Sequence, residues 1–284
     1  MNFFIIIFSV IKIFMFTFYT FAKPEPVMEQ DKKQTITIQE GVLSAGIEIG
    51  YPPMEYYNIN GETLINFDLE LINALAEKLE LQVNYVDTSW ERKLTGLDAD
   101  RFDIAVNVTI LPDRGERYSF TKPYIERSMA IVALKESLIK IEKQEDIAGK
   151  RTAYQGGTAA QCFTEEIREK GIKFTSFSYD KITNCFSALA LKRIDLIVAD
   201  NIAAFYYANN YGTVGNVSSG SENAVFEVIW QGPSYEYTGI ALKKGNDTLT
   251  EMLNNALDEL FEDGTLREIS SRIFNINIYA PSEN

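Results

Sequence analysis

The sequence predicts an α/β fold built from two open, mostly parallel sheets with helices on their faces. Short strand-like segments alternate with helical segments, and this alternation occurs twice in succession along the chain. Two β-α-β-α-β units in a row imply two such sheets. The length of 284 residues agrees, because it suits one large domain or two small ones.

The first unit begins where apolar residues start to alternate. Leu43, Ala45, Ile47 and Ile49 share one face of a strand, so Glu48 lies on the opposite face near the strand's carboxyl end. A stripe of apolar residues with acidic residues in the first turn predicts the following helix. The predicted elements are a strand at 42–49, a helix at 67–80, a strand at 82–87, a short helix at 90–97 and a buried strand at 103–109.

The second unit repeats this order and leads into a helical tail. The tail contains two predicted helices from about Asp247 to Phe274, broken at Gly264. The predicted strands of this part are 151–155, 173–179, 195–199 and 238–244, and its other predicted helices are 158–170, 182–193 and 201–210.

The first 22 residues are almost wholly apolar, and a polar, proline-containing stretch follows them. Thr20 and Ala22 resemble a signal-peptidase site, which favours a cleaved signal peptide at 1–22 and a disordered leader at 23–34. Lys12 interrupts the apolar run, and the alternatives are an uncleaved membrane anchor or a buried helix. A signal peptide and an anchor would both export the mature chain.

The composition excludes several chemistries. The formal net charge of −13 disfavours nucleic acid and anionic lipid as partners. Because the chain has no histidine and two cysteines, Ser-His-Asp, Cys-His, histidine-metal and four-cysteine sites are excluded, and we expect no metal and no cofactor. Cys162 and Cys185 lie on consecutive helices that would flank opposite faces of a sheet, so we expect buried free thiols.

In sheets of this kind, ligands bind in the crevice beyond the carboxyl ends of the strands. The segments at these ends are 48–54, 107–114 and 154–159, together with Asp200. We therefore expect the functional site among these residues.

Five stretches, in order, resemble the bacterial periplasmic amino-acid-binding proteins, the extracellular solute-binding family that serves ABC importers. Each stretch is a weak match alone, but five in order with family-like spacing are specific, and they cover roughly residues 40 to 275. The stretches are IEIGYPPMEYYNINGETLINFDLELINALAEKLEL, RFDIAVNVTILPDRGERYSFTKPYIE, EDIAGKRTAYQGGTA, DLIVADNIAA and DELFEDGTLREISSRIF.

The resemblance implies a site that holds both ends of a zwitterion. Arg114 lies six residues before Phe120, the family's spacing for the arginine that binds an α-carboxylate through two parallel hydrogen bonds. Thr109 would offer a hydroxyl or N–H to the same carboxylate. Asp200 stands where the family's aspartate accepts from the ligand ammonium. A surface ion pair is the alternative for Arg114, and an ordinary helix N-cap is the alternative for Asp200.

The other predicted contacts surround the ligand. Glu48 matches an acidic position that reaches toward the side chain or amine of the ligand, and Tyr51 and Trp90 match rings that sandwich its side chain. Thr158 opens a helix whose free N–H groups suit a carboxylate. A solvated carboxylate, core packing and a helix N-cap are the respective alternatives. Asn107, Tyr154 and Gly157 complete the predicted set.

The sequence also departs from the family's pattern. Leu111 stands where the family usually has threonine, and Asn107 replaces a small residue. The stretch from Asp103 to Arg114 is one residue shorter than the family's pattern. These changes leave the α-amino-acid class of the ligand open.

The resemblance implies the two-lobed, type II periplasmic-binding-protein fold, each lobe a mostly parallel sheet flanked by helices, with two crossover hinge segments. Crossings near Arg127 and Tyr237 would place 35–126 plus 238–284 in lobe 1 and 127–237 in lobe 2. A ligand that touches both lobes would stabilise a closed form, which an ABC permease of the inner membrane would recognise. The chain would then be a periplasmic, monomeric binding protein rather than an enzyme.

Two other classes of function remain open. Relatives of the family resemble cyclohexadienyl or arogenate dehydratases, and such an enzyme would use Glu48 as the acid that protonates a leaving hydroxyl. A membrane-tethered sensor module would instead retain residues 1–22.

Overall fold

The computed structural model describes residues 36–56, 66–210 and 225–274, except for the side chains of Ser234 and Tyr235. The predicted signal peptide at 1–22 and leader at 23–34 lie outside the described residues. Nearly all of the predicted strands and helices fall within them.

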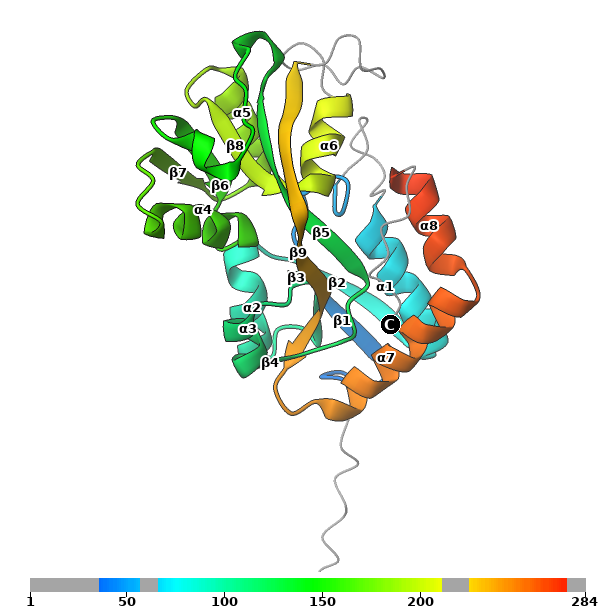
Figure 1. The fold of residues 1–284 in the computed structure, drawn as a ribbon. Helices are drawn as coiled ribbons and strands as arrows, with labels where there is room; N and C mark the ends of the chain where they lie inside the picture. The colour runs from blue at the N-terminus through cyan, green and yellow to red at the C-terminus, as the bar shows by residue number, and fades with distance from the viewer. Residues whose placement is uncertain (1–35, 57–65, 211–224, 275–284) are drawn as a thin grey trace, which may run out of the picture. The chain divides into compact units, whose positions relative to one another are not determined.

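Six short strands form two parallel groups, as the two predicted units require (Figure 1). In the first group β1 pairs with β2 and β3, and in the second group β6 pairs with β7 and β8. The bounds are β1 Val42–Ile47, β2 Gln82–Asp87, β3 Ile104–Thr109, β6 Arg151–Gln155, β7 Thr175–Tyr179 and β8 Leu196–Asp200. The carboxyl ends of these strands carry most of the residues predicted to bind the ligand.

Two long antiparallel strands, β5 (Ile125–Leu134) and β9 (Phe226–Lys243), join the groups into one hydrogen-bonded sheet. The strand order is β2-β1-β3-β9-β5-β8-β6-β7, and β4 (Tyr118–Phe120) also pairs with β9. The sequence predicted two separate sheets, whereas the structure has one continuous sheet. Arg127 pairs with Glu236 and Glu126 with Tyr237, so the two positions predicted for the chain crossings lie side by side.

The sequence did not predict strand β5 or the first part of β9, because their side chains do not alternate between apolar and polar. Every residue of β5 except Glu126 is buried, and its residues 129–134 form a continuous apolar run without alternation. In β9, Gly232 and Pro233 interrupt the pattern before the predicted part at 238–244. Pairing between distant segments therefore decides where these strands begin.

The helices agree well with the predicted positions. Helix α6 spans the predicted residues 201–210, and a break at Gly264, where φ is +84°, separates α7 from α8. The short α3, which carries Arg114, was not predicted. The bounds are α1 Phe67–Lys78, α2 Trp90–Asp98, α3 Pro112–Arg117, α4 Ala159–Glu169, α5 Ile182–Ala190, α6 Asn201–Asn210, α7 Asp247–Glu262 and α8 Thr265–Phe274.

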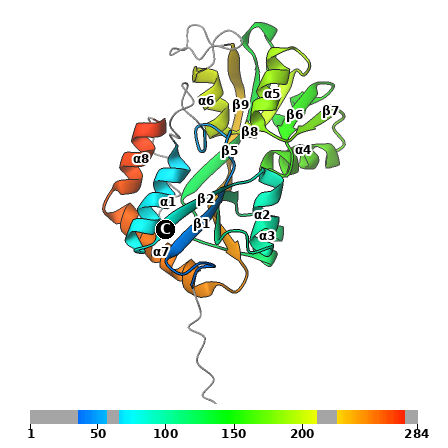
Figure 2. The ribbon, with the colours of Figure 1, turned by 180° about the vertical axis from the view of Figure 1, so that it is seen from behind.

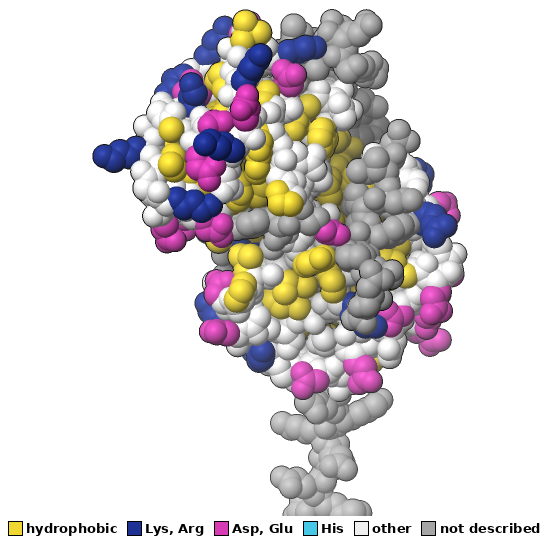
Figure 3. All heavy atoms as spheres, in the orientation of Figure 1, with side chains coloured by type: hydrophobic (Ala, Val, Ile, Leu, Met, Phe, Trp, Pro, Cys, Tyr) yellow, Lys and Arg dark blue, Asp and Glu magenta, His cyan; other side chains and the backbone are white. Residues whose placement is uncertain are grey.

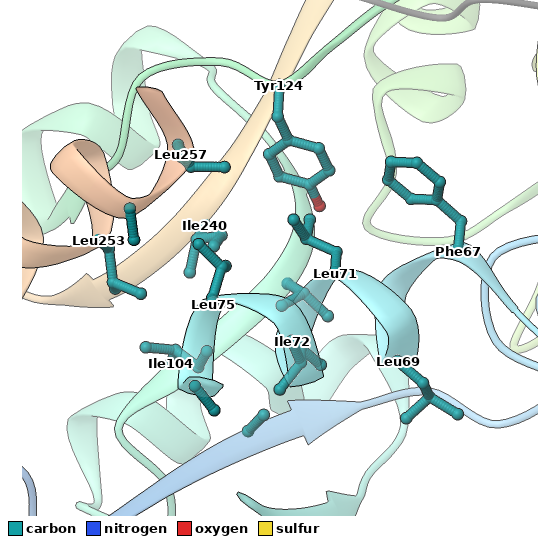
Figure 4. Packing of buried hydrophobic residues seen from close by; sticks show 14 of the residues in the cluster. Phe67, Leu69, Leu71, Ile72, Leu75, Ile104, Tyr124, Ile240, Leu253 and Leu257 are labelled. Carbon is teal, nitrogen blue, oxygen red and sulfur yellow. The ribbon is translucent and has the colours of Figure 1, made fainter. Parts of the chain in front are cut away.

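Apolar clusters cover both faces of the first strand group. Leu71, Ile72 and Leu75 of α1 pack toward Ile104 of β3, and α7 contributes Leu253 to the same cluster (Figure 4). A second cluster joins α2 to the sheet through Leu97, Phe102, Ala105, Val108 and Tyr118. Seen from behind, α2 and α3 lie on the side away from α7 and α8 (Figure 2). Burial on both faces fixes the register of the strands.

The second strand group is covered in the same way. Along β5, Ala130 and Val132 face the cluster that includes α5 and α6, whereas Met129 and Ile131 face the cluster that includes α4. This alternation places the side chain of each β5 residue on a defined face. Arg127, at the start of the series, is thereby directed to one side of the sheet.

None of the helices within the described ranges is long and apolar enough to cross a membrane. On the face shown in Figure 3, Lys and Arg side chains are interspersed with Asp and Glu side chains. That face therefore offers no continuous basic surface of the kind that tracks a phosphate backbone. Cys162 and Cys185 are both free thiols, as predicted, although Cys162 is partly exposed rather than buried.

Candidate functional site

A small cavity lies where the ends of β1, β3, β6 and β8 meet the β5–β9 pair. The space open to the centres of water molecules is about 30 Å³, enough for one or two waters. The lining residues are Glu48, Tyr51, Trp90, Asn107, Thr109, Arg127, Met129, Gln155, Thr158, Ala159, Ala160, Ile182, Val198, Ala199, Asp200 and Glu236. The cavity therefore lies where the strand-end rule predicted a site, with two long strands as an additional wall.

Most of the residues predicted to bind the ligand line this one cavity. They are Glu48, Tyr51, Trp90, Asn107, Thr109, Thr158 and Asp200. Arg114, Tyr154 and Gly157 do not line it. Tyr154 packs instead in the apolar cluster beside α4.

Glu48 follows β1 and is 3% exposed. The Nε2 of Gln155 donates to its two carboxylate oxygens, at 2.9 and 3.2 Å. Burial raises the pKa of Glu48 to about 7, against the lowering effect of Lys93. This carboxyl group therefore changes its charge near neutral pH, and it can either meet a ligand cation or donate a proton.

A buried ion pair supports the backbone that carries Glu48. Glu55 and Lys93 are 0% and 1% exposed, and Lys93 Nζ lies 3.0 Å from Glu55 Oε1. The second carboxylate oxygen of Glu55 accepts from the Glu48 N–H at 3.0 Å. Burial, and then the charge of Glu55, raises the pKa of Asp68 well above its ordinary value. Burial therefore disfavours the charged form of Asp68, which lies in the first turn of α1.

Asp200 caps a helix, as one of its two sequence-based interpretations held, and it also lines the cavity, whereas its contact with a ligand ammonium stays a prediction. Its Oδ1 accepts from the N–H groups of Ile202 and Ala203, both at 3.0 Å, and so caps α6. Its Oδ2 accepts from the Tyr51 hydroxyl and lies 3.7 Å from Arg127 Nη1. Both oxygens of this carboxylate therefore have partners within the protein.

A bulge in β3 turns Asn107 toward Arg127. The pairing of β3 with β9 shifts between Ala105 and Val108, and Asn107 has a φ of +59°, a region that asparagine tolerates better than most residues. Its Oδ1 accepts from Arg127 Nη2 at 2.6 Å. The departure from a small residue thus provides a partner for the guanidinium of Arg127.

Thr109 is the last residue of β3, and its side chain contacts Glu236, another charged residue of the cavity lining. Its hydroxyl donates to Glu236 Oε2 at 2.9 Å. Burial raises the pKa of Glu236 to about 7, and the charge of Arg127 acts in the opposite direction. Since this hydroxyl is engaged with Glu236, contact between the Thr109 hydroxyl and a ligand carboxylate stays a prediction.

Arg114 links the two strand groups through backbone oxygens. Its Nη1 donates to Thr109 O at 3.0 Å and its Nη2 donates to Gly157 O at 2.7 Å. Its guanidinium carbon lies 5.5 Å from the centre of the Trp90 ring, and burial lowers the pKa of Arg114. The predicted contact between Arg114 and a carboxylate stays a prediction.

The turn before α4 presents a helix start to the cavity. Thr158 donates its hydroxyl to Gln155 O at 2.7 Å, so this side chain does not cap the helix. The Gly157 N–H donates to Gln161 Oε1 at 2.8 Å. Ala159 and Ala160 line the cavity, which places the first turn of α4, with its positive end, in the wall.

Sequence reasoning missed the charged residues contributed by the long strands. Arg127 and Glu236 lie opposite each other in the β5–β9 register, in segments that gave no strand signal. Gln155 could have been found, because it ends a predicted strand inside the segment 154–159. The missed apolar lining residues are Met129, Ile182, Val198 and Ala199, with Ala159 and Ala160 at the helix start.

The lining carries three carboxyl groups, Glu48, Asp200 and Glu236, and one guanidinium, Arg127. Positive and negative groups on one wall suit a molecule that carries both signs, because buried charges need partners. Within the described part of the chain, no three Asp, Glu or Cys residues come together as metal ligands. The site therefore has the features of a polar, charged binding cavity.

A two-lobed fold whose strand ends enclose a charged cavity defines the class of solute-binding proteins. Residues 43–276 match the bacterial extracellular solute-binding proteins, family 3. The chain belongs to this family.

Curated relatives are similar over nearly their whole length. The L-cystine-binding protein TcyJ of Escherichia coli (strain K12) is 28% identical over 241 residues, which are 84% of this chain and 85% of the relative. The L-cystine-binding protein TcyA of Bacillus subtilis (strain 168) is 28% identical over 83% of this chain and 82% of its own length. ABC transporter arginine-binding protein 1 of Escherichia coli (strain K12) is 28% identical over 82% and 90%.

Solved structures with the same fold include binding proteins and a precursor of an enzyme. An ancestral arginine-binding protein bound to arginine has a TM-score of 0.75 and 29% identity, over 83% of this chain and 99% of that one. The ancestral amino-acid-binding protein AncCDT-1, a precursor of cyclohexadienyl dehydratase, has a TM-score of 0.70 and 27% identity, over 82% and 95%.

Proposed function

We propose that this chain captures an amino acid or a similar small zwitterion between its two lobes and delivers it to an ABC importer. One observation carries the proposal: Glu48 and Trp90 from the first strand group and Thr158 and Asp200 from the second line one charged cavity. The family membership and the names of the relatives, which bind cystine and arginine, support an amino-acid ligand. The protein itself catalyses no reaction.

The two lobes comprise residues 35–126 plus 238–284 and residues 127–237. The register of β5 and β9 supports these limits, because Arg127 and Tyr237 lie on the paired strands that connect the groups. Ligand contacts from both lobes stabilise the closed form, which the permease recognises. A small-angle scattering measurement with and without ligand tests this closure, and no compaction at saturation would contradict it.

Binding is tested directly by titration calorimetry with L-cystine, L-arginine, L-histidine and L-glutamine. A ligand at 100 times its Kd should also stabilise the protein by about 2.7 kcal/mol, which a melting experiment detects. Failure of these and other small zwitterions to bind would contradict the proposal.

The protein acts outside the cytoplasmic membrane as a monomer, after removal of residues 1–22. The apolar character of that segment and the extracellular family support this location. Mass spectrometry of the mature N-terminus tests it. Retention of residues 1–22 would favour a membrane-tethered sensor or binding module instead.

A second candidate is a dehydratase on the same fold. It is favoured by the pKa of Glu48, which burial raises to about 7, because a general acid needs such a value. The likeness to AncCDT-1 also supports it. Incubation with prephenate and with arogenate tests this activity, with Glu48→Gln as the inactive control. Aromatic product with the native chain alone would favour the enzyme.

A further inference from the structure

A second hollow, separate from the charged cavity, opens beside the start of α2. The space open to the centres of water molecules is about 320 Å³, against about 30 Å³ in the cavity. The residues that line it are Asp87, Thr88, Ser89, Arg92, Arg101 and Lys181. None of these six residues lines the cavity proposed for the zwitterion. The hollow therefore has room for a small solute with part of its water.

The hollow lies between the two parallel strand groups. Asp87 is the last residue of β2, and Ser89 is the N-cap of α2, so both belong to the first group. Lys181 is the N-cap of α5 and belongs to the second group. Its Nζ donates to Ile49 O, just beyond β1, at 3.3 Å. A solute in the hollow can therefore contact both groups at once.

Three cations line the hollow, against one carboxylate. Arg92 and Arg101 are exposed, and Lys181 is partly buried. Within the described ranges, none of these three side chains forms an ion pair. The carboxylate is that of Asp87, whose Oδ1 accepts from the Ile49 N–H at 3.2 Å. The lining thus carries two more positive than negative charges, on a chain whose formal net charge is −13, and such a local excess attracts anions.

The carboxylates nearest to Arg101 in the sequence pair with other cations. Asp98 Oδ2 lies 3.3 Å from Arg117 Nη2, and Asp100 Oδ1 lies 2.7 Å from Lys243 Nζ. These pairs leave the guanidinium of Arg101 available to an anion from solution, which it can meet with two parallel hydrogen bonds.

Neutral donors accompany the cations in the same wall. Thr88 is 8% exposed, and its hydroxyl has no hydrogen-bond partner among the described residues, whereas buried hydroxyls normally have one. Ser89 makes no side-chain hydrogen bond to the start of α2, so the first N–H groups of this helix lack their usual side-chain acceptor. Hydroxyl, backbone N–H and guanidinium groups are the donors that bind oxyanions.

We propose that this hollow binds a small, doubly charged oxyanion of the phosphate or sulfate class between cations of both strand groups. Arg92 and Arg101 bind it from the first group and Lys181 from the second, while the Thr88 hydroxyl and the start of α2 donate to its oxygens. The excess of two positive charges matches a dianion. The inference goes beyond the proposed function, because the anion is not the captured zwitterion and its site is not the cavity.

Titration calorimetry at about pH 8, where phosphate is mainly a dianion, tests the site. The ionic strength is held constant with sodium chloride, and no amino acid is added. Sulfate and inorganic phosphate should bind with a Kd of about 1 mM or less, and acetate should bind at least about tenfold more weakly. Glycerol 3-phosphate separates two sources of this chemistry. It binds more tightly than inorganic phosphate if the site serves a phosphate ester and more weakly if it serves a free anion, and either result supports the site.

Single substitutions test the assigned contacts. Arg92→Gln, Arg101→Gln and Lys181→Gln should each weaken sulfate binding about tenfold, because each removes a charge-assisted hydrogen bond. Thr88→Val, which removes a neutral donor and keeps the shape, should weaken it about threefold. The control is Arg151→Gln, which removes one positive charge from a partly exposed ion pair elsewhere and should leave the affinity within about twofold. Melting curves in sodium chloride show that each variant is folded.

Three outcomes would overturn the proposal. Sulfate and phosphate that bind no more tightly than acetate at equal ionic strength would show that no dianion site exists. If Arg151→Gln weakens binding as much as Arg92→Gln and Arg101→Gln, the effect comes from the overall charge of the chain. Full affinity in Lys181→Gln would contradict a site held by both strand groups. Because no amino acid takes part in these titrations, their result does not depend on the proposed function.

Discussion

Gln155 Nε2 donates to both carboxylate oxygens of Glu48, at 2.9 and 3.2 Å, although the two residues are 107 positions apart in the chain. Glu48 follows β1 and Gln155 ends β6, so the bond joins the two parallel strand groups at the cavity. It also places an amide against a carboxyl group whose charge is sensitive to pH. The first prediction concerns this pair.

Glu48→Gln should stabilise the protein at alkaline pH. Burial raises the pKa of Glu48 to about 7 from an ordinary value of 4.5, so the folded state holds a proton that the unfolded chain releases. The contribution of Glu48 to the free energy of unfolding therefore falls as the pH rises from about 4.5 to about 7. Relative to the native chain, the variant should gain up to about 3 kcal/mol at about pH 8 and little at about pH 4. Urea denaturation at both values measures this, and an equal difference at both would contradict it.

Lys93→Met should destabilise the protein strongly. The substitution leaves Glu55 buried without its cation, at a cost of about 3–5 kcal/mol in the free energy of unfolding. The control is Lys78→Met, which breaks ion pairs with Glu259 and Asp263 that are partly exposed, at a cost of less than about 1 kcal/mol. Denaturant unfolding of the two variants measures the difference. Similar losses would show that the pair of Lys93 and Glu55 is not buried as described.

Gly157→Ala should weaken ligand binding beyond its effect on the backbone. Gly157 has a φ of +72°, and a methyl group there would lie 3.2 Å from Trp90 Nε1 in the wall of the cavity. Gly149 has a φ of +73°, with nothing within 4 Å of such a methyl group. Gly149→Ala therefore reports the backbone cost alone, about 1 kcal/mol. Calorimetry and melting of both variants separate the two effects, and equal losses of affinity would contradict the prediction.

The two thiols should react at different rates and should not form a disulfide. Burial raises the pKa of Cys185 to about 12, and this residue is 0% exposed, whereas Cys162 is partly exposed. A thiol reagent added to the folded protein should label Cys162 first and Cys185 only on unfolding. Mass spectrometry of the labelled protein counts the thiols. A single slow phase for both residues would contradict this assignment.

The sequence by itself determined the local elements and their order. Side-chain periodicity identified the parallel strands and their helices to within a few residues, because each element buries one face and its pattern repeats within a short stretch. The strand-end rule then located most of the cavity's walls. Glu48, Asn107, Thr158 and Asp200 could be named in this way.

The tertiary structure alone decided the role of β5 and β9. These strands pair across about a hundred residues of chain, and β5 is buried on both faces, so its sequence carries no alternation. Arg127 and Glu236 consequently gave no local signal. Their position in the site depends on the register between two distant strands.

The tertiary structure also decided the hydrogen-bond partners and the pKa values of the ionisable groups at the cavity. The sequence supplied Arg114 and Asp200 as ends of an ionic site, but the structure gives Arg114 two carbonyl partners and Asp200 a helix to cap. Burial, which no single residue encodes, raises the pKa of Glu48 and Glu236 to about 7. Local pattern thus specifies which groups reach the strand ends, whereas desolvation and pairing between distant segments decide which of them are free to bind.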